Sequence, residues 1–491
     1  MDLPNNNFAV IVGTGIIESM VAAACSLAGK KVLQVDSMDT YGTENVSYTL
    51  DHLFKWATST DSLEEFSSAD ISPDVIQLHS LKKQFHSAAV KCDHVSSSSE
   101  SLTNSLAKLF ESDNCDMSYA THVLKKTSID LNPKILFSRD DFIENLVSSE
   151  ACRYCEFCSV DVVAMNADGL LQKAICSRAS IFADKQILYE DKWKIMKLIK
   201  KELLTPNDDK TENRPDRFDD FLSERGIKGQ IYKYLFESIC TCRSLETSTN
   251  QALKQGKHFC SSIGIYSESP YIWTTYGSGD LTQAYCRLAA VNGCVYCLNL
   301  NCQSLEVIDN KIANLKLNDN TTVCGQHFII NRSYVEHDKP DELHQISRMI
   351  LITRKSVLSG STKNIFLHYF PDDSQIAAEI LEICIDPKLP LYIVYVAAHS
   401  DENRTAAFEN IRTWIDDESA MLLQLSYKQR YSSNKCTKLA ENCFLASSNN
   451  PDENFFFFGN IVDQAFGIFK NILPDNEFMK RADLCDSICD N

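Results

Sequence analysis

The feature that most constrains the fold of this 491-residue chain is a strand–turn–helix–strand pattern near its beginning. Phe8–Val12 is an apolar run typical of a buried strand, and a glycine turn follows it at Gly13 and Gly15. Ser19–Leu27 has the composition of a compact helix, and Lys31–Val35 predicts a second strand. Because a helical crossover between neighbouring strands is right-handed, we expect the two strands to be parallel. The chain is therefore predicted to open with the βαβ unit of a Rossmann-like sheet.

The glycine turn has two of the three glycines of a dinucleotide-binding fingerprint. Gly13 permits the turn, Gly15 would let a pyrophosphate approach, and Asp36 follows about 20 residues later, where a ribose-binding acid belongs. Glu18 replaces the third glycine, and its carboxylate would compete with the phosphate. Two like charges about 4 Å apart repel by about 4 kcal/mol at an effective dielectric of about 20. We therefore predict a degenerate turn and no cofactor, with a working FAD or nicotinamide site as the alternative.

The pattern along the rest of the chain predicts two structural regions. Strand patterns dominate the beginning and the end, and one of them, Leu389–Ala398, is an apolar run too short to span a bilayer. The sequence predicts an α/β protein in which residues 1–172 and 271–491 form a discontinuous Rossmann-like domain of the FAD-binding type. Residues 173–270 are predicted to form an inserted all-helical domain. The serine-rich residues 92–116 predict a mobile loop or insert.

One stretch of the predicted helical domain, Ile187–Leu204, has apolar residues at helical spacing. The apolar stripe holds Trp193, Met196, Ile199 and Leu203, and the lysines outside it are Lys192, Lys197, Lys200 and Lys201. We expect a bundle helix with a solvated basic edge, and a membrane-surface helix is the alternative.

The charge of the chain restricts its partners. It has 48 Lys and Arg against 66 Asp and Glu, a formal net charge of −18. Nucleic-acid phosphates and anionic membranes bind dense basic faces, so this charge argues against both as lasting partners. The first residues, MDLPNNN, lack the basic start and apolar run of an export signal. The twenty cysteines are therefore expected to be reduced thiols in an intracellular protein.

Three of these cysteines are spaced at intervals of three residues, as in some metal-binding sequences. Cys152, Cys155 and Cys158 follow the pattern of an iron–sulfur ligand run. The fourth cysteine and its proline are missing, since Val162 stands at the expected position. The flanking valines and aromatic residues favour a strand, so we predict strand cysteines and no metal site.

Four blocks of sequence resemble the superfamily of Rab GDP-dissociation inhibitors and Rab escort proteins. They are residues 10–37 followed by Tyr41 and Gly42, then SPYIWTTYGSGDLTQAYCRLAAVNGCVYCL at residues 269–298, QISRMILIT at Gln345–Thr353, and Phe455–Gly459, where the last Rossmann strand of the family would lie. The resemblance covers nearly the whole chain in order. The pair Cys286-Arg287 and the serine-rich insert favour the escort branch, with a dissociation inhibitor as the alternative.

The resemblance implies a protein that has no catalytic residues of its own. Escort proteins of this superfamily bind GDP-bound Rab GTPases and present them to the Rab geranylgeranyltransferase heterodimer. They then hold the geranylgeranyl lipid on the Rab and deliver the product to a membrane, so a cytosolic protein is implied. Since each buried methylene of the lipid contributes about 0.8 kcal/mol, the tail needs an apolar shelter, for which the predicted helical domain is suited.

The resemblance also assigns roles to particular residues. The Rab-binding platform of the superfamily maps onto Tyr41, Gly42, Tyr276, Gly277, Gly279, Asp280, Gln283, Arg287 and Tyr296. Asp280 and Arg287 would anchor the GTPase switch region by charged hydrogen bonds. Read without the resemblance, Asp280 is a helix cap and Arg287 a solvated helix charge. Phe259 is expected on the face that docks the transferase.

Overall fold

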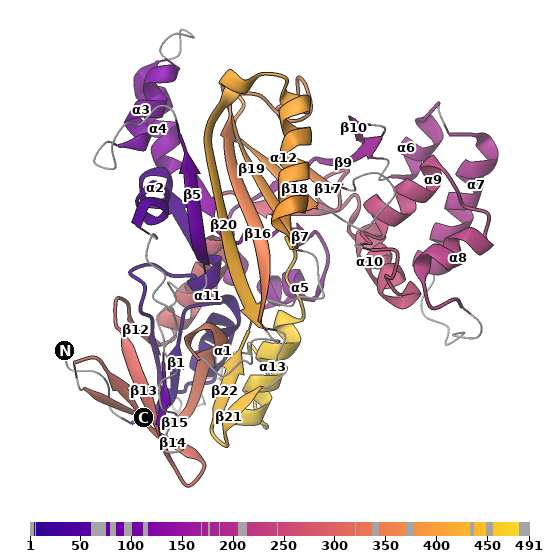
Figure 1. Cartoon of the computed structure of the whole chain (residues 1–491). Helices are drawn as coiled ribbons and strands as arrows, with labels where there is room; N and C mark the ends of the chain where they lie inside the picture. Colours follow the sequence, from indigo (N-terminus) through magenta and orange to yellow (C-terminus); the bar gives the residue numbers. More distant parts are fainter. Residues whose placement is uncertain are drawn as a thin grey trace, which may run out of the picture.

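The structure of the chain is a computed structural model. It describes residue 4 and residues 6–59, 75–78, 85–92, 101–110, 116–167, 169–174, 177–185, 187–204, 214–242, 244–319, 321–335, 343–369, 378–432, 437–447 and 455–480. Figure 1 shows two sheets and a separate group of helices. Among the described residues, no helix combines the length and the apolar character needed to cross a membrane.

The first sheet is the predicted Rossmann-like sheet. Its strands are β1 (Asn7–Val12), β2 (Val32–Val35), β4 (Val75–Gln77), β12 (Val295–Cys297), β13 (Cys302–Ile308), β14 (Lys311–Leu317), β15 (Thr322–Asn331), β21 (Lys438–Ala440) and β22 (Cys443–Ala446). The order β12-β2-β1-β15-β22 is parallel, and β14, β13 and β4 continue from β15 in antiparallel pairing. Ala9 lies opposite Val32, which confirms the predicted parallel pairing. The last parallel strand is β22, whereas Phe455–Gly459 forms no strand, so the strand implied for that segment is wrong.

Four helices cover one face of this sheet. They are α1 (Ile16–Leu27), α5 (Asp141–Ser148), α11 (Gly279–Val291) and α13 (Ile461–Ile472). Every residue of α1 is buried, because its alanine-rich surface lets α11 and α13 pack closely on both sides. Helix α1 starts three residues before the predicted Ser19.

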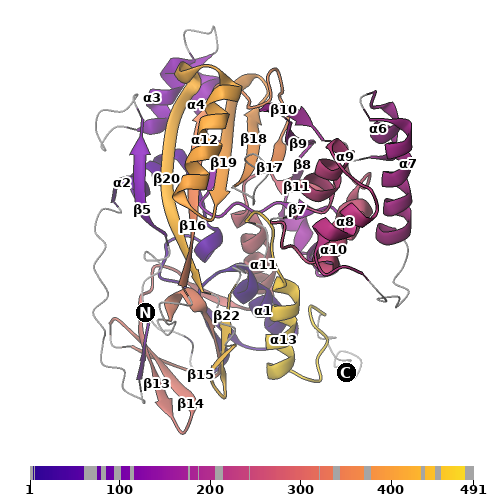
Figure 2. The ribbon, with the colours of Figure 1, turned by 45° about the vertical axis from the view of Figure 1, so that its right-hand side comes forward.

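The second sheet has eight strands in the order β10-β9-β17-β18-β19-β16-β20-β5. They are β5 (Phe85–Lys91), β9 (Val162–Ala167), β10 (Leu170–Lys173), β16 (Leu343–Thr353), β17 (Ile365–Tyr369), β18 (Ala378–Asp386), β19 (Leu389–Ala398) and β20 (Met421–Ser432), and α12 (Asp401–Ile415) packs on one face. The strand predicted at Leu389–Ala398 is confirmed as β19. In both views α11 lies where the two sheets approach each other (Figures 1 and 2).

Smaller strands and helices pack around the two sheets. They are β3 (Ser47–Thr49), β6 (Ser128–Asp130), β7 (Leu136–Phe137), β8 (Phe157–Ser159), β11 (Tyr271–Thr274), α2 (Leu50–Ser59), α3 (Leu102–Leu109) and α4 (Met117–Lys126). Helix α3 corrects the prediction of a loop within residues 92–116, for the part Leu102–Leu109. Ser101 accepts a hydrogen bond from the Asn104 N–H, and Leu102 and Leu106 are fully buried, so these residues form a capped, packed helix. The serine run at residues 96–99 lies outside the described residues.

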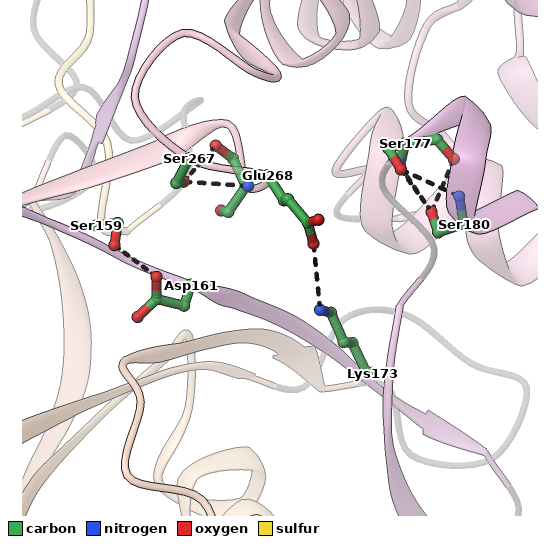
Figure 3. A network of polar contacts seen from close by, with 8 residues as sticks. Ser159, Asp161, Lys173, Ser177, Ser180, Ser267 and Glu268 are labelled. Carbon is green, nitrogen blue, oxygen red and sulfur yellow. Dashed lines mark hydrogen bonds and ion pairs between the residues drawn. The ribbon is translucent and has the colours of Figure 1, made fainter.

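The remaining helices lie between β10 and β11 and form a separate group beside β9 and β17 (Figures 1 and 2). They are α6 (Arg178–Ala183), α7 (Tyr189–Leu198), α8 (Phe218–Glu224), α9 (Gln230–Lys233) and α10 (Thr249–Ser262), with π-helical turns at Ile199–Leu203 and Tyr234–Ile239. Figure 3 shows the junction, where Lys173 at the end of β10 pairs with Glu268 before β11 at 3.9 Å. Both side chains are mainly exposed, so this ion pair adds little stability.

The orientation predicted for the Ile187–Leu204 helix is partly wrong. Trp193 is 55% exposed, whereas Ile195 and Leu198 are buried. Lys192 is buried because its ammonium donates hydrogen bonds to the carbonyls of Phe182 and Asp184. A long lysine stem can cover apolar surface while its charge reaches backbone acceptors, and the apolar stripe in the sequence does not show this.

The three spaced cysteines do not form one strand, so that prediction is corrected too. Cys152 lies in a short 3₁₀ helix, Ala151–Tyr154, and Cys158 lies in β8. Cys155 falls between these elements and is half-buried.

Candidate functional site

The glycine turn has the backbone geometry of a dinucleotide-binding turn. Gly13 has φ of +103°, and a Cβ there would lie 2.9 Å from the Cβ of Asn331. Its N–H donates to the Val35 carbonyl at 2.8 Å, which joins the turn to β2. Gly15 stands at the N-terminus of α1. The space in front of that helix end is where such turns hold a phosphate.

Glu18 fills this space. Its side chain is buried and folds back over Gly15, so that a Cβ added at Gly15 would collide with Glu18 Oε2. Burial raises the pKa of Glu18 well above its usual range, and the neighbouring carboxylate of Glu44 raises it further. Charge repulsion with a phosphate is what the sequence predicts at this position. The structure shows that the side chain obstructs the turn by occupying the volume, and the raised pKa favours its neutral form.

Asp36 is fully buried, and both oxygens of its carboxylate accept hydrogen bonds from other groups of the protein. Oδ2 accepts hydrogen bonds from the Thr14 N–H, the Thr14 hydroxyl and the Thr43 hydroxyl. Oδ1 accepts from the Met38 N–H and the Tyr334 hydroxyl. A ribose hydroxyl would have to displace these donors, so Asp36 holds the loop after β2 in place of a nucleotide.

We expect Glu18→Gln to change the pH dependence of stability. The pKa of Glu18 in the folded protein is raised above its usual value of 4.5. The contribution of its neutral form to folding stability is therefore fully present below about pH 4.5 and is lost as the pH rises through the folded pKa. Glutamine does not titrate, so the stability of the variant relative to the wild type should increase between pH 5 and pH 8. The gain should grow as the pH rises across this range, because ionisation of the buried carboxyl destabilises only the wild type. Urea unfolding at the two pH values measures it, and parallel profiles for the two proteins would refute the burial argument.

A second feature, which we call the α11 hollow, lies on the exposed side of α11. It has a volume of about 320 Å³ and is lined by Tyr41, Tyr154, Asp280, Gln283, Ala284, Cys286, Arg287, Ala290 and Tyr296. Tyr41, Asp280, Gln283, Arg287 and Tyr296 were singled out from the sequence, and the fold brings them together from three separate segments. Sequence reasoning missed Tyr154, because only the fold brings it beside α11.

The α11 hollow has a negative and a positive side chain at different positions along the helix. Asp280 lies in the first turn of α11 and is half-buried, and burial raises its pKa to about 6, with Asp130 and Glu156 adding to the effect. Arg287 is exposed two turns later on the same face. Its guanidinium carbon lies 5.0 Å from the centre of the Tyr154 ring. The hollow therefore presents a carboxylate and a guanidinium to the same partner surface.

Two tyrosines form the other wall of the α11 hollow. The Tyr41 and Tyr296 rings meet edge to face at 5.5 Å. Burial, and then the Cys286 thiol, raise the pKa of Tyr296 well above its usual range. Both rings are half-buried, so they offer apolar area at the bottom of a polar hollow.

The other predicted platform residues lie behind or beside the α11 hollow. Tyr276 is 44% exposed next to the start of α11, but it does not line the hollow. Gly42, Gly277 and Gly279 are buried. The local structure requires glycine at these positions. Gly42 has φ of +122°, which side chains rarely allow, and a Cβ at Gly279 would lie only 2.7 Å from the Ser47 hydroxyl. The structure thus gives these glycines a supporting role in the backbone, and a direct contact with a partner stays a prediction.

Phe259 does not lie on a docking face. Its ring is fully buried and packs edge to face on Tyr271 at 5.9 Å. Exposed aromatic side chains in this group of helices lie instead on α6 and α7. We call Phe182, Tyr189 and Trp193 the α6–α7 aromatic patch. They are 37%, 67% and 55% exposed, and the rings of Phe182 and Tyr189 each contact the ring of Trp193.

Comparison with known proteins gives a consistent result. The family described as GDP dissociation inhibitor matches residues 4–77 and 75–377. The Rab proteins geranylgeranyltransferase component A of Drosophila melanogaster is 29% identical over 362 residues, which cover 72% of this chain and 64% of that protein. Component A 1 of Rattus norvegicus is 24% identical over 97% of this chain and 92% of its own length. Component A 1 of Caenorhabditis elegans is 25% identical over 98% and 96%.

Solved structures show the same fold. A Rab GDI from Plasmodium falciparum superposes with a TM-score of 0.67 at 17% identity, over 97% of this chain and 100% of that one. A putrescine oxidase variant superposes with a TM-score of 0.50 at 10% identity, over 96% and 99%. Both confirm the α/β, Rossmann-like fold that the sequence predicts. With the family match extending over most of its length, the chain belongs to the GDP dissociation inhibitor family.

Proposed function

We propose that this protein is a Rab escort protein, a non-catalytic accessory component that binds GDP-bound Rab GTPases and presents them to Rab geranylgeranyltransferase. Relatives named as component A of that transferase match over nearly the whole chain, which supports the escort role. The observation that carries the proposal is the convergence of Tyr41, Asp280, Arg287 and Tyr296 on the α11 hollow.

The chemistry of the α11 hollow suits a protein surface that carries both charges. Arg287 can bind a carboxylate of the partner through two N–H donors, and Asp280 can accept from a basic or amide group. The rings of Tyr41 and Tyr296 supply apolar contact between the charges, as aromatic residues commonly do at interface centres. We propose this hollow as the Rab-binding site.

Replacing Arg287 by alanine should weaken binding of GDP-loaded Rab about tenfold or more. The guanidinium is exposed, so its removal should leave stability nearly unchanged while the partner carboxylate loses its hydrogen bonds. Isothermal titration with a GDP-loaded Rab measures the effect. Lys311→Ala is the matched control, because Lys311 is 61% exposed on β14 and pairs with Glu441 outside the hollow. Equal affinities for wild type and Arg287→Ala would remove this residue from the site.

We propose the α6–α7 aromatic patch as the surface that docks the transferase, in place of Phe259. Clustered exposed aromatic side chains are typical of protein interfaces, and this patch lies on a different element from the α11 hollow. Trp193→Ala should therefore reduce transferase-dependent prenylation several-fold while Rab affinity stays at the wild-type value. Prenylation and binding measured on the same preparation separate the two effects. If both fall together, or neither changes, the patch is not a separate docking surface.

We propose that the helices of residues 173–270 shelter the geranylgeranyl lipid, and that a cytosolic complex carries it to membranes. Helix α10 lies between the two π-helical turns, and a Cβ at Gly256 would lie 2.9 Å from both Leu203 and the Cys240 thiol. A lipid tail would have to part these apolar contacts. A Rab bearing a photoreactive geranylgeranyl group should label peptides from residues 178–262, and labelling confined to other segments would contradict this location.

Two other functions predict different results. A dissociation inhibitor would bind prenylated Rab but would not support the transferase. An FAD-dependent oxidoreductase would copurify with stoichiometric flavin and show its absorption band, whereas Glu18 fills the phosphate position and Asp36 is already saturated. The escort role requires that the chain supports prenylation by the transferase and copurifies without stoichiometric flavin.

A further inference from the structure

We infer that Tyr154 is a positioning residue of the Rab-binding site, which holds the guanidinium of Arg287 in the orientation that receives a partner carboxylate. The inference rests on the proposed function of the α11 hollow. It adds to that site a residue from a fourth segment of the chain, the 3₁₀ helix Ala151–Tyr154.

The position of Tyr154 is fixed by hydrogen bonds to the start of α11. The Cys155 thiol, the next side chain along, donates to the Asp280 carbonyl at 3.7 Å. The Glu156 carbonyl accepts from the Thr275 N–H at 2.9 Å. These contacts bind the segment to both the first turn of α11 and the strand before it. The ring of Tyr154 is thus placed by the same backbone that places Asp280.

Tyr154 differs from its neighbours in what it contacts. Ala151 is fully buried, and Cys152 and Cys155 pack against the core beneath α1 and α11. Tyr154 does not belong to that core, and 36% of its surface is exposed. An aromatic ring kept out of the core and facing an arginine is suited to a role at the surface.

The contact orders Arg287 and leaves its donors available. Among the residues that the structure describes, no carboxylate forms an ion pair with Arg287, while its guanidinium carbon lies 5.0 Å from the Tyr154 ring centre. A cation–π contact restrains the side chain without using its N–H groups. An arginine that is already ordered loses less conformational freedom on binding, so the same hydrogen bonds give higher affinity.

The test is a double-mutant cycle on binding of a GDP-loaded Rab to the full chain. Tyr154→Ala should weaken binding about twofold to fivefold, the range expected for an exposed cation–π contact. Tyr154→Phe keeps the ring and should keep near wild-type affinity. In the Arg287→Ala background, Tyr154→Ala should have no further effect. Tyr266→Ala is the control, because Tyr266 is 64% exposed and does not line the hollow.

Two outcomes overturn the inference, and one of them leaves the proposed function intact. If Arg287→Ala weakens binding but Tyr154→Ala does not, or the two effects add, only the positioning role fails. If the wild type does not bind GDP-loaded Rab, the proposed function fails with it. Tyr154→Leu keeps apolar bulk without a π face, so it gives the same test if the alanine variant does not fold, and wild-type affinity for it contradicts the inference.

Discussion

Replacing Gly277 by alanine is expected to destabilise the protein by about 3 kcal/mol or more. Gly277 has φ of +90°, which costs an L-residue about 1–2 kcal/mol. A Cβ there would also collide with Asp130 Oδ1 and lie 2.7 Å from the Ser47 hydroxyl. Urea unfolding of the two proteins measures the difference.

The collision matters because Asp130 and Ser47 organise the start of α11. The Ser47 hydroxyl donates to Asp130 Oδ1 at 2.5 Å and accepts from the Gly279 N–H at 3.0 Å. Asp130 Oδ2 accepts from the Ser278 N–H at 2.7 Å. Moving either side chain leaves buried groups of Ser278 or Gly279 without acceptors, at about 1–3 kcal/mol each.

Gly293 provides the matched control for Gly277. Its φ is +93°, and a Cβ there would meet nothing within 4 Å. Gly293→Ala should therefore show the backbone cost alone, about 1–2 kcal/mol. Equal losses of stability for the two variants would show that the contacts with Asp130 and Ser47 are unimportant.

The second large effect is expected for Arg348→Ala, in the block QISRMILIT that resembles the superfamily. Arg348 is almost fully buried on β16, and its guanidinium donates to Gln429 Oε1 at 2.6 Å and to Asn132 Oδ1 at 2.7 Å. Burial lowers its pKa. Alanine would leave a cavity and remove donors from both buried amides, so we expect a loss of about 3–5 kcal/mol.

Arg412→Ala is the surface control for Arg348→Ala. Arg412 lies on α12, is 39% exposed and pairs with Glu409 and Glu418. Exposed ion pairs contribute about 1 kcal/mol or less, so this variant should unfold close to the wild type. If Arg348→Ala is as stable as Arg412→Ala, the buried hydrogen bonds of Arg348 to Asn132 and Gln429 do not stabilise the fold as expected.

The parts of the fold that depend on local pattern could be predicted from the sequence. The β1–α1–β2 unit follows from apolar runs around Gly13, and β19 follows from an uninterrupted apolar run. Helix α3 was missed because a serine run precedes it, although Leu102, Leu106 and Phe110 have the i, i+4, i+8 spacing of a buried helix face.

The parts that depend on tertiary contacts could not be predicted. Lys192 is buried and Trp193 exposed because carbonyls of a preceding helix accept from the lysine, which no spacing reveals. Phe259 lies at a helix position that sequence alone cannot assign to core or surface. The α11 hollow was predicted in part, through the resemblance, but the approach of Tyr154 to Arg287 requires the fold.

These observations describe a dinucleotide-type scaffold whose phosphate position is filled by Glu18 and whose neighbouring helix α11 presents a hollow with both charges. Both features are consistent with the proposed binding of a small GTPase in place of a dinucleotide. Gly13 and Gly15 allow close packing in this turn, where they are closed in by Asn331 and Glu18.

Prenylation of a GDP-loaded Rab by purified geranylgeranyltransferase, with and without this chain, tests the proposal most directly. We predict that incorporation of labelled geranylgeranyl groups into the Rab rises severalfold when the wild-type chain is added, and much less with Arg287→Ala. A chain that binds prenylated Rab yet gives no more incorporation than transferase alone would contradict the escort function.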